Sequence, residues 1–142
     1  MKKSIMLVAF VVVASLGFAQ KMKSAEVPTV VKDALRKQFP AAQGIKWDKE
    51  KGNYEASFDL NKVDNSVLID GNGKILETEV EIEMSELPKG VSEYVKANYK
   101  GMTIKEAAKL TDAAGVVTYE AEVKGMDLIF DQAGKFLKES KD

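Results

Sequence analysis

Acidic side chains recur at every second position in one segment of the chain. Glu77, Glu79, Glu81 and Glu83 alternate there with Thr78, Val80 and Ile82. Successive side chains of a β-strand point to opposite faces, so the four carboxylates are predicted to share one face. Glu55 and Asp59 alternate with apolar residues in an earlier segment, and we expect them on the same side of a sheet.

This acidic stripe has a structural and a functional interpretation. Like charges on neighbouring strands stand about 4.5–5.5 Å apart and repel each other. The sequence favours the structural interpretation, a solvated face or an edge strand that charge protects from aggregation. In the functional interpretation the stripe binds a basic protein, a polyamine or a cation. The candidate residues for binding a ligand or partner are then Glu55, Asp59, Glu77, Glu79 and Glu81.

Two residue types that carry much of enzyme chemistry are missing. The sequence contains no His and no Cys, so Ser-His-Asp and Cys-His arrangements are impossible. Zinc and copper would lack their preferred ligands, and no disulfide can form. Paired carboxylates for glycoside hydrolysis need a deep cleft, which a small two-layer protein offers little room for. We therefore assign no catalytic residue, no metal site and no cofactor.

Carboxylate-based cation binding remains open on composition. The segment Asp70-Gly71-Asn72-Gly73 resembles the start of a calcium loop, and Glu81 is at the twelfth position from Asp70. However, Lys74 occupies the fifth position, where a ligand is needed. The segment is better explained as a hairpin turn, because Gly and Asn accept the positive φ that such turns require.

The first 19 residues have the form of a secretory signal peptide. Lys2 and Lys3 precede an apolar run from Ile5 to Phe18, and small residues at Gly17 and Ala19 suit cleavage after Ala19. The run is too short to span a bilayer core of about 30 Å, so no membrane span is expected after cleavage. The remaining chain has 19 basic and 22 acidic residues, which gives no support for a nucleic-acid partner. The predicted location is the periplasm or the medium.

The rest of the chain appears twice. Residues 67–76 and 128–137 match at a shift of 61, with Asp, Gly, Lys and Leu kept in place. Upstream of them, Val27-Pro28 and Leu87-Pro88 open two segments whose apolar residues recur every four positions, which predicts a helix in each. Alternating segments follow both predicted helices and predict strands.

These patterns predict an α+β fold. Each repeat would be a helix followed by a four-stranded antiparallel sheet, with the helices on one face and an open, wet sheet face on the other. The expected boundaries are 20–26 for a flexible N-terminus, 27–84 for the first repeat and 85–142 for the second. A single 58-residue unit buries little core, so we expect the two copies to share one core.

Three aromatic residues are predicted to lie in that core. Trp47, the only tryptophan, alternates with charged residues and is better explained as core than as an interface anchor. Tyr54 and Tyr119 begin the matching triplets Tyr-Glu-Ala and are expected at equivalent core positions.

The wet face of the second repeat is predicted to be mixed in sign. It would carry Lys105, Lys109, Thr118, Glu120 and Glu122. If both repeats form one binding surface, the first half should recognise positive charge more strongly.

The order of these motifs, repeated, resembles the PepSY-like, β-lactamase-inhibitor-like proteins. The resemblance rests on the two Val/Leu-Pro helix starts, the two Tyr-Glu-Ala strands and the two Leu-Ile-Asp/Leu-Ile-Phe-Asp hairpins with their Gly-Lys pairs, and it covers residues 27–139. The resemblance implies a fold of two similar α/β modules that present a concave sheet. Proteins of this family are common as small exported proteins of Bacteroides-type bacteria. The role that the resemblance implies is non-catalytic binding. It identifies no particular partner, since a shared fold does not carry a function with it.

We therefore expect a non-catalytic exported binding or inhibitor-like module, which uses the open sheet face to hold a protein or a small ligand. One alternative is a carboxylate-based scavenger of cations or small ligands. A minimal hydrolase is the weakest alternative.

Overall fold

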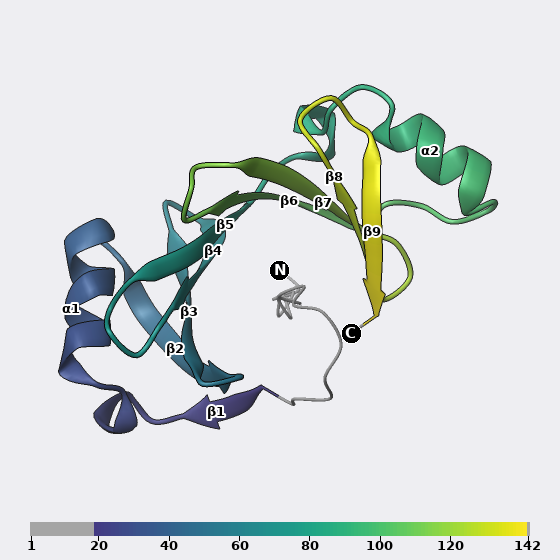
Figure 1. The fold of residues 1–142 in the computed structure, drawn as a ribbon. Helices are drawn as coiled ribbons and strands as arrows, with labels where there is room; N and C mark the ends of the chain where they lie inside the picture. The colour runs from purple at the N-terminus through teal and green to yellow at the C-terminus, as the bar shows by residue number, and fades with distance from the viewer. Residues whose placement is uncertain (1–18, 142) are drawn as a thin grey trace.

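A computed structural model describes residues 19–141 and shows an α+β fold (Figure 1). The elements are, in chain order, β1 (Gln20–Met22), α1 (Thr29–Gln38), β2 (Gln43–Glu50), β3 (Asn53–Leu60), β4 (Val63–Ile69), β5 (Ile75–Glu81), α2 (Val91–Asn98), β6 (Glu106–Asp112), β7 (Val117–Glu122), β8 (Met126–Phe130) and β9 (Phe136–Lys141). Two single turns of 3₁₀ helix, η1 (Ser24–Glu26) and η2 (Met84–Glu86), precede the two α-helices.

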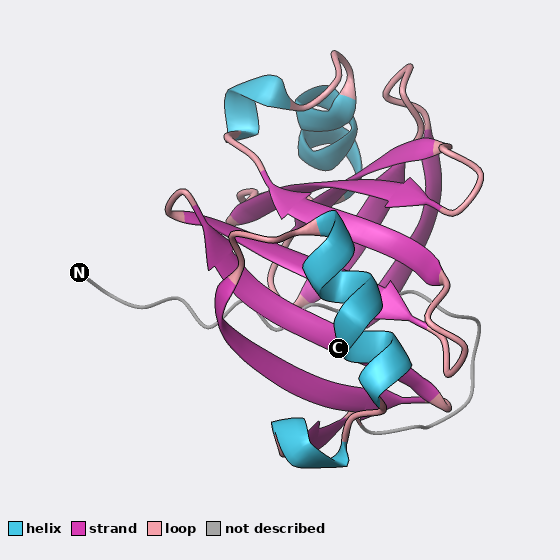
Figure 2. Ribbon diagram, turned by 90° about the vertical axis from the view of Figure 1, so that its left-hand side faces the viewer, coloured by secondary structure: helices cyan, strands magenta, loops and turns pink. Residues whose placement is uncertain are grey.

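All nine strands form one antiparallel sheet whose spatial order follows the chain from β1 to β9. The two halves are continuous, because β5 pairs with β6 over five residue pairs, from Glu77 with Asp112 to Glu81 with Ala108. The sheet is strongly curved, and both helices pack on its outer side (Figures 1 and 2). We call the opposite, inner side of the sheet the concave face.

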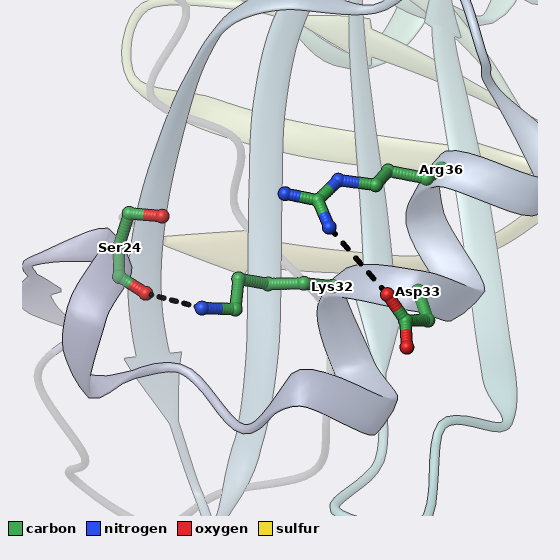
Figure 3. Close-up of polar contacts among 4 residues, drawn as sticks. All are labelled: Ser24, Lys32, Asp33 and Arg36. Carbon is green, nitrogen blue, oxygen red and sulfur yellow. Dashed lines mark hydrogen bonds and ion pairs between the residues drawn. The ribbon is translucent and has the colours of Figure 1, made fainter.

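Helix α1 buries the apolar stripe that the sequence predicts. Val31 and Leu35 are 0% and 1% exposed. The helix ends where the Phe39 N–H donates to the Leu35 carbonyl, one residue before Pro40. Its polar side stays near the surface, where Lys32 Nζ donates to the Ser24 carbonyl at 3.2 Å and Arg36 pairs with Asp33 at 3.5 Å (Figure 3). Exposed pairs of this kind contribute little to stability, so burial of the stripe holds the helix in place.

Helix α2 repeats this arrangement in the second half. Gly90, at φ 99°, is its N-cap, and Val91 and Val95 are 0% and 2% exposed. At its end the Tyr99 hydroxyl donates a hydrogen bond to the Glu139 carboxylate, which connects α2 to β9.

The helices build two separate cores, so the expectation of one shared core is wrong. The first core contains Val27, Val31, Leu35, Trp47, Ala56, Phe58, Val67 and Ile69, and the second contains Val91, Val95, Ala121, Val123, Leu128 and Phe130. Each helix covers only the strands that follow it, and the curvature of the sheet places the two helices apart (Figure 1). Trp47 is 5% exposed in the first core, as predicted.

Tyr54 and Tyr119 occupy matching positions on the outer side of the sheet. Tyr54 pairs with Lys49 and Ile69, and Tyr119 pairs with Lys109 and Phe130. Both are half-buried, and Tyr54 packs against the first core. The predicted equivalence is confirmed in the strand register, although neither ring is a fully buried core residue.

The hairpin turns are confirmed and have the same hydrogen bonds. Asp70 Oδ1 accepts the N–H groups of Asn72 at 2.8 Å and Lys74 at 2.9 Å. Asp131 Oδ1 does the same for Ala133 and Lys135, both at 2.9 Å. A short acidic side chain in the first position therefore closes each turn.

Residues 20–26, for which the sequence indicated a flexible segment, hold strand β1 and the turn η1. Strand β1 pairs with β2 through Gln20 with Lys49, Lys21 with Asp48 and Met22 with Trp47. The predicted signal peptide lies outside the described residues except for Ala19. Among residues 19–141, no helix is long and apolar enough to cross a membrane.

Candidate binding face

The candidate residues Glu55, Asp59, Glu77, Glu79 and Glu81 share the concave face. Directly paired residues of neighbouring strands point to the same side of a sheet. Glu55 pairs with Leu68, which pairs with Glu77, and both acids therefore face the same way. Asp59 pairs with Asp64 on the same side. The helices pack against the alternate residues of these strands, such as Ala56 and Val67.

Glu83 does not belong to this face. Strand β5 ends at Glu81, two residues earlier than the alternating pattern suggests. Glu83 is the N-cap of η2, where its N–H donates to Glu86 Oε2 at 2.8 Å. Met84, the next apolar residue of the alternating pattern, lies in η2 and is exposed.

The expectation that Lys105 and Lys109 lie on this face in the second half is wrong. Lys109 pairs with Val80 and Tyr119, so it lies on the outer side, and Lys105 lies before β6 begins. Thr118, Glu120 and Glu122 do lie on the concave face. Strand β6 contributes Glu106 and Asp112 to the same side, and β8 contributes Asp127.

The whole concave face is therefore acidic. Its carboxylates in the paired register are Asp48, Glu50, Glu55, Asp59, Asp64, Glu77, Glu79, Glu81, Glu106, Asp112, Glu120, Glu122 and Asp127. The lysines that the strands place there are Lys21, Lys46 and Lys138. Thirteen carboxylates against three lysines make a strongly negative surface in a chain whose net charge is only −1.

Sequence reasoning missed Glu106, Asp112 and Asp127. Residues 107 and 108 are both alanines, so apolar residues are present on both sides of β6 and the alternation does not show which side faces the helices. The pairing of Glu81 with Ala108 and of Glu79 with Leu110 decides it. Of these three residues, Asp127 could have been predicted from the sequence. It alternates with the apolar residues Met126 and Leu128 in the same way as Glu79 alternates with Thr78 and Val80.

The centre of the concave face is buried, although the sequence predicted a wet surface. Glu79 is 1% exposed and Glu55 is 4% exposed. Neither Oε1 nor Oε2 of Glu79 has a hydrogen-bond partner, and both atoms are buried.

Burial changes the proton affinity of these acids. Desolvation, reinforced by Glu50 and Asp48, raises the pKa of Glu55 to about 8. Desolvation, reinforced by Glu55, Glu77 and other acids of the face, raises the pKa of Glu79 to about 8. Desolvation also raises the pKa of Glu77 to about 7, although Lys138 opposes it. The centre of the face thus holds carboxyl groups that exchange protons near neutral pH.

A second acidic cluster lies toward one end of the face. A hydrogen bond with Asp59, together with burial and the nearby acids Glu81 and Glu106, raises the pKa of Asp64 to about 6. Glu81 and Glu106 also line a cavity of about 360 Å³ with Lys62 and Lys105. Lysines are therefore available at this end of the face to balance part of its charge.

Apolar side chains lie between the acids. Leu68, Ala108, Leu110 and Ile129 are on the concave face and are 6%, 1%, 4% and 3% exposed. Leu110 and Ile129 line a second cavity of about 200 Å³, together with Glu77, Asp112 and Lys138. Acidic and apolar side chains therefore lie next to one another on the concave side of the sheet, and these four apolar side chains are buried. Within residues 19–141, no group of three or more acidic residues is placed to hold a metal ion.

A comparison with known protein families finds one family whose profile matches the chain twice. The sequence profile of the beta-lactamase-inhibitor-like, PepSY-like family matches residues 18–77 and again residues 66–138. The chain belongs to this family. The two matches agree with the two helices and with the resemblance seen in the motifs. None of the curated proteins compared with this PepSY-like chain matches it.

Solved structures share the fold of this PepSY-like protein. A protein described as periplasmic from Bacteroides eggerthii is 21% identical with a TM-score of 0.72, over 81% of this chain and 88% of that one. A DUF2874-family protein from Bacteroides uniformis is 23% identical with a TM-score of 0.70, over 80% and 88%. A BLIP-like protein from Bacteroides fragilis is 25% identical with a TM-score of 0.63, over 80% and 85%.

Proposed function

We propose that this PepSY-like protein is a non-catalytic binding module that works outside the cytoplasm and holds a partner on its concave face. The observation that carries the proposal is the carboxylate of Glu79, buried and without a hydrogen-bond partner at the centre of that face. A buried, unpaired carboxylate lowers the stability of the fold when it is ionised. Proteins tolerate such local costs mainly at functional sites.

The two sides of the sheet differ in what they contact, and this difference supports the proposal. Both helices pack on the outer side, where they build the two cores. The acids of the concave face are therefore not needed to position a helix. A non-catalytic role is consistent with the absence of His and Cys from the sequence. Export is consistent with the predicted signal peptide and with the relatives described as periplasmic.

Site-specific photo-cross-linking in the host tests this proposal. A cross-linking amino acid replaces Ser57 or Thr118, which lie on the concave face in the two halves. The matched controls replace Lys109, on the outer side of β6, or Glu93, on the exposed side of α2. We expect Ser57 and Thr118, and neither control, to yield the same cross-linked species. That partner, once purified, should bind the protein in solution. Equal cross-linking from both sides of the sheet would contradict the proposal.

A further inference from the structure

The second cavity of the concave face, of about 200 Å³, lies over strands β5 to β9. Each of these five strands contributes to its wall, from Glu77 on β5 to Lys138 on β9. Neighbouring strands lie about 4.8 Å apart, so four intervals of a flat sheet would separate these two residues by about 19 Å. The curvature of the sheet brings both of them to one cavity (Figure 1).

Part of the cavity wall is apolar and open to solvent. Among residues 19–141, four large apolar side chains are exposed, and two of them, Val116 and Leu137, line this cavity at 55% and 49% exposed. Val116 follows the turn that Asp112 closes, and Leu137 has no direct partner on β8, because the register shifts between Ile129 and Phe130. Such irregularities of a strand re-aim side chains. Single exposed apolar residues are ordinary, whereas two from separate hairpins beside one cavity indicate a binding site.

The charged side chains of this cavity can also be reached from solvent, and their charges do not balance. Asp112 and Lys138 are exposed, and Glu77 is half-buried. Glu77 pairs directly with Asp112 across β5 and β6, and like charges in that position repel each other. Lys138 lies close enough to lower the pKa of Glu77, against the opposite effect of Asp112. Two carboxylates against one ammonium group leave a single negative charge, which one further cation neutralises.

The size and lining of the cavity restrict the ligand. Sites for drug-sized ligands usually have volumes of about 300–1,000 Å³, so this cavity suits a smaller molecule. A metal ion would leave Val116 and Leu137 without apolar contacts, and an aliphatic carboxylate would meet two acids of its own charge. An alkylammonium ion suits both parts of the wall, because its charged end forms charge-assisted hydrogen bonds with carboxylates and its chain covers apolar surface.

We infer that the second cavity binds a small aliphatic amine, with its ammonium group against Glu77 and Asp112 and its alkyl chain against Val116 and Leu137. This inference rests on the proposed function, because it takes the concave face as the binding side, and it specifies one class of ligand. Leu110 and Ile129 also line the cavity but are already buried, so no contact with the ligand is required of them.

Titration followed by nuclear magnetic resonance tests the inference directly. The protein is produced with its own leader, labelled with ¹⁵N and purified from the exported fraction. The probe is isopentylamine at pH 7.5, where Glu77, whose pKa is about 7, is mostly ionised. Isovalerate has the same branched chain with the opposite charge, and methylamine has the charge without the chain. We expect isopentylamine to cause saturable shifts of the amide signals of Val116 and Leu137, and both controls to bind about fivefold or more weakly.

Variants of the apolar wall have a matched control in the same chain. Val116→Ser with Leu137→Ser removes the two exposed apolar side chains of the cavity. Val30→Ser with Met84→Ser removes the other two exposed apolar side chains, which lie outside it. We expect the first pair to weaken isopentylamine binding about fivefold or more and the second to leave it unchanged. The amide spectrum checks folding, and Leu137→Ser alone replaces the first pair if that pair does not fold.

Variants of the acids test where the ammonium group binds. Glu77→Gln with Asp112→Asn removes both carboxylates, and an amide oxygen at position 112 can still accept the hydrogen bonds of its turn. We expect this pair to weaken isopentylamine binding about fivefold or more. Asp33→Asn with Glu93→Gln, on the exposed sides of the helices, should leave binding unchanged. The inference would be overturned by the absence of a saturable shift, by equal binding of isovalerate, or by equal losses for the cavity pairs and their controls.

Two results separate this inference from the proposed function. If cross-linking from Ser57 and Thr118 captures a partner and isopentylamine does not bind, the proposed function stands and the amine site fails. If isopentylamine binds as expected and cross-linking is equal from both sides of the sheet, the amine site stands and the proposed function fails.

Discussion

Gly134 lies directly against the backbone of Lys89. A Cβ atom on Gly134 would stand 2.2 Å from the Lys89 carbonyl oxygen, closer than any such contact allows. The first half repeats the relationship, because a Cβ on Gly73 would stand 2.9 Å from the Val30 carbonyl oxygen. In both halves the hairpin turn therefore packs on the start of the helix of its own repeat.

This contact predicts a large loss of stability for Gly134→Ala. The residue has φ 82°, which costs an alanine about 1–2 kcal/mol by itself, and the contact with Lys89 adds to that. We expect a decrease of at least about 3 kcal/mol in the free energy of unfolding, measured by urea denaturation. Gly115→Ala is the matched control, since Gly115 also has φ 82° but nothing lies within 4 Å of its added Cβ. Equal losses for the two variants would show that the contact does not matter.

The buried acids predict that stability falls as pH rises toward alkaline values. Glu55 and Glu79 have pKa values of about 8 in the folded protein, against 4.5 for an ordinary Glu. Between these values the folded chain keeps protons that the unfolded chain has lost, so raising the pH favours unfolding. The stabilisation is complete below about pH 4.5 and is lost as pH rises through 8. We expect the free energy of unfolding to be several kcal/mol larger at pH 5 than at pH 9, roughly 4 kcal/mol for each of the two groups, measured by urea denaturation.

Replacing Glu79 should remove part of this dependence. Glu79→Gln keeps the size of the side chain but cannot ionise, so it should be more stable than the unchanged protein at pH 9 by roughly 4 kcal/mol. At pH 5 the two proteins should be of similar stability. Asp33→Asn, on the exposed side of α1, is the control and should leave the pH profile unchanged. A profile that Glu79→Gln does not flatten would contradict the burial of an ionisable group there.

Trp47 offers a direct report on the first core. It is the only tryptophan and is 5% exposed, so the folded protein should emit at shorter wavelength than the unfolded chain and should resist quenching by acrylamide. Trp47→Ala should destabilise the fold by about 3–5 kcal/mol, because it leaves a cavity between α1 and the sheet. A red-shifted emission from the folded protein would place Trp47 on the surface instead.

Calcium should not stabilise this protein specifically. Within residues 19–141 no acidic cluster is placed to hold a metal ion, and Asp70 already accepts two backbone hydrogen bonds in its turn. We expect the melting temperature to be the same in calcium and in magnesium at equal ionic strength. A rise of several degrees that only sub-millimolar calcium produces would revive the cation-scavenger alternative.

Local patterns were enough to predict much of the architecture. The stripe containing Val31 and Leu35 required a helix with one buried side, and its repeat predicted a second helix at Val91 and Val95. The Asp70 turn followed from residue types that accept positive φ. These features depend on residues within a few positions of one another, so the chain shows them without its tertiary structure.

The binding face could be predicted only in part. Strand alternation correctly placed Glu55, Glu77 and Glu79 on one side, because alternation is a property of each strand. It failed for Lys109, because β6 has apolar residues on both sides and only the pairing with β5 shows which side faces the helices. The length of β5 was also overestimated, since η2 begins where the alternation continues.

The amino-acid sequence by itself determined the duplication, the two amphipathic helices, the closing of the hairpins and the absence of His and Cys chemistry. Only the tertiary structure decided that the halves join edge to edge through β5 and β6, that their cores stay separate, and that acids from both repeats meet on one concave face. The physical reason is that strand pairing and sheet curvature bring together residues such as Glu77 and Asp112, which are far apart in the chain. Burial of Glu79, and with it the rise of its pKa, exists only after that assembly.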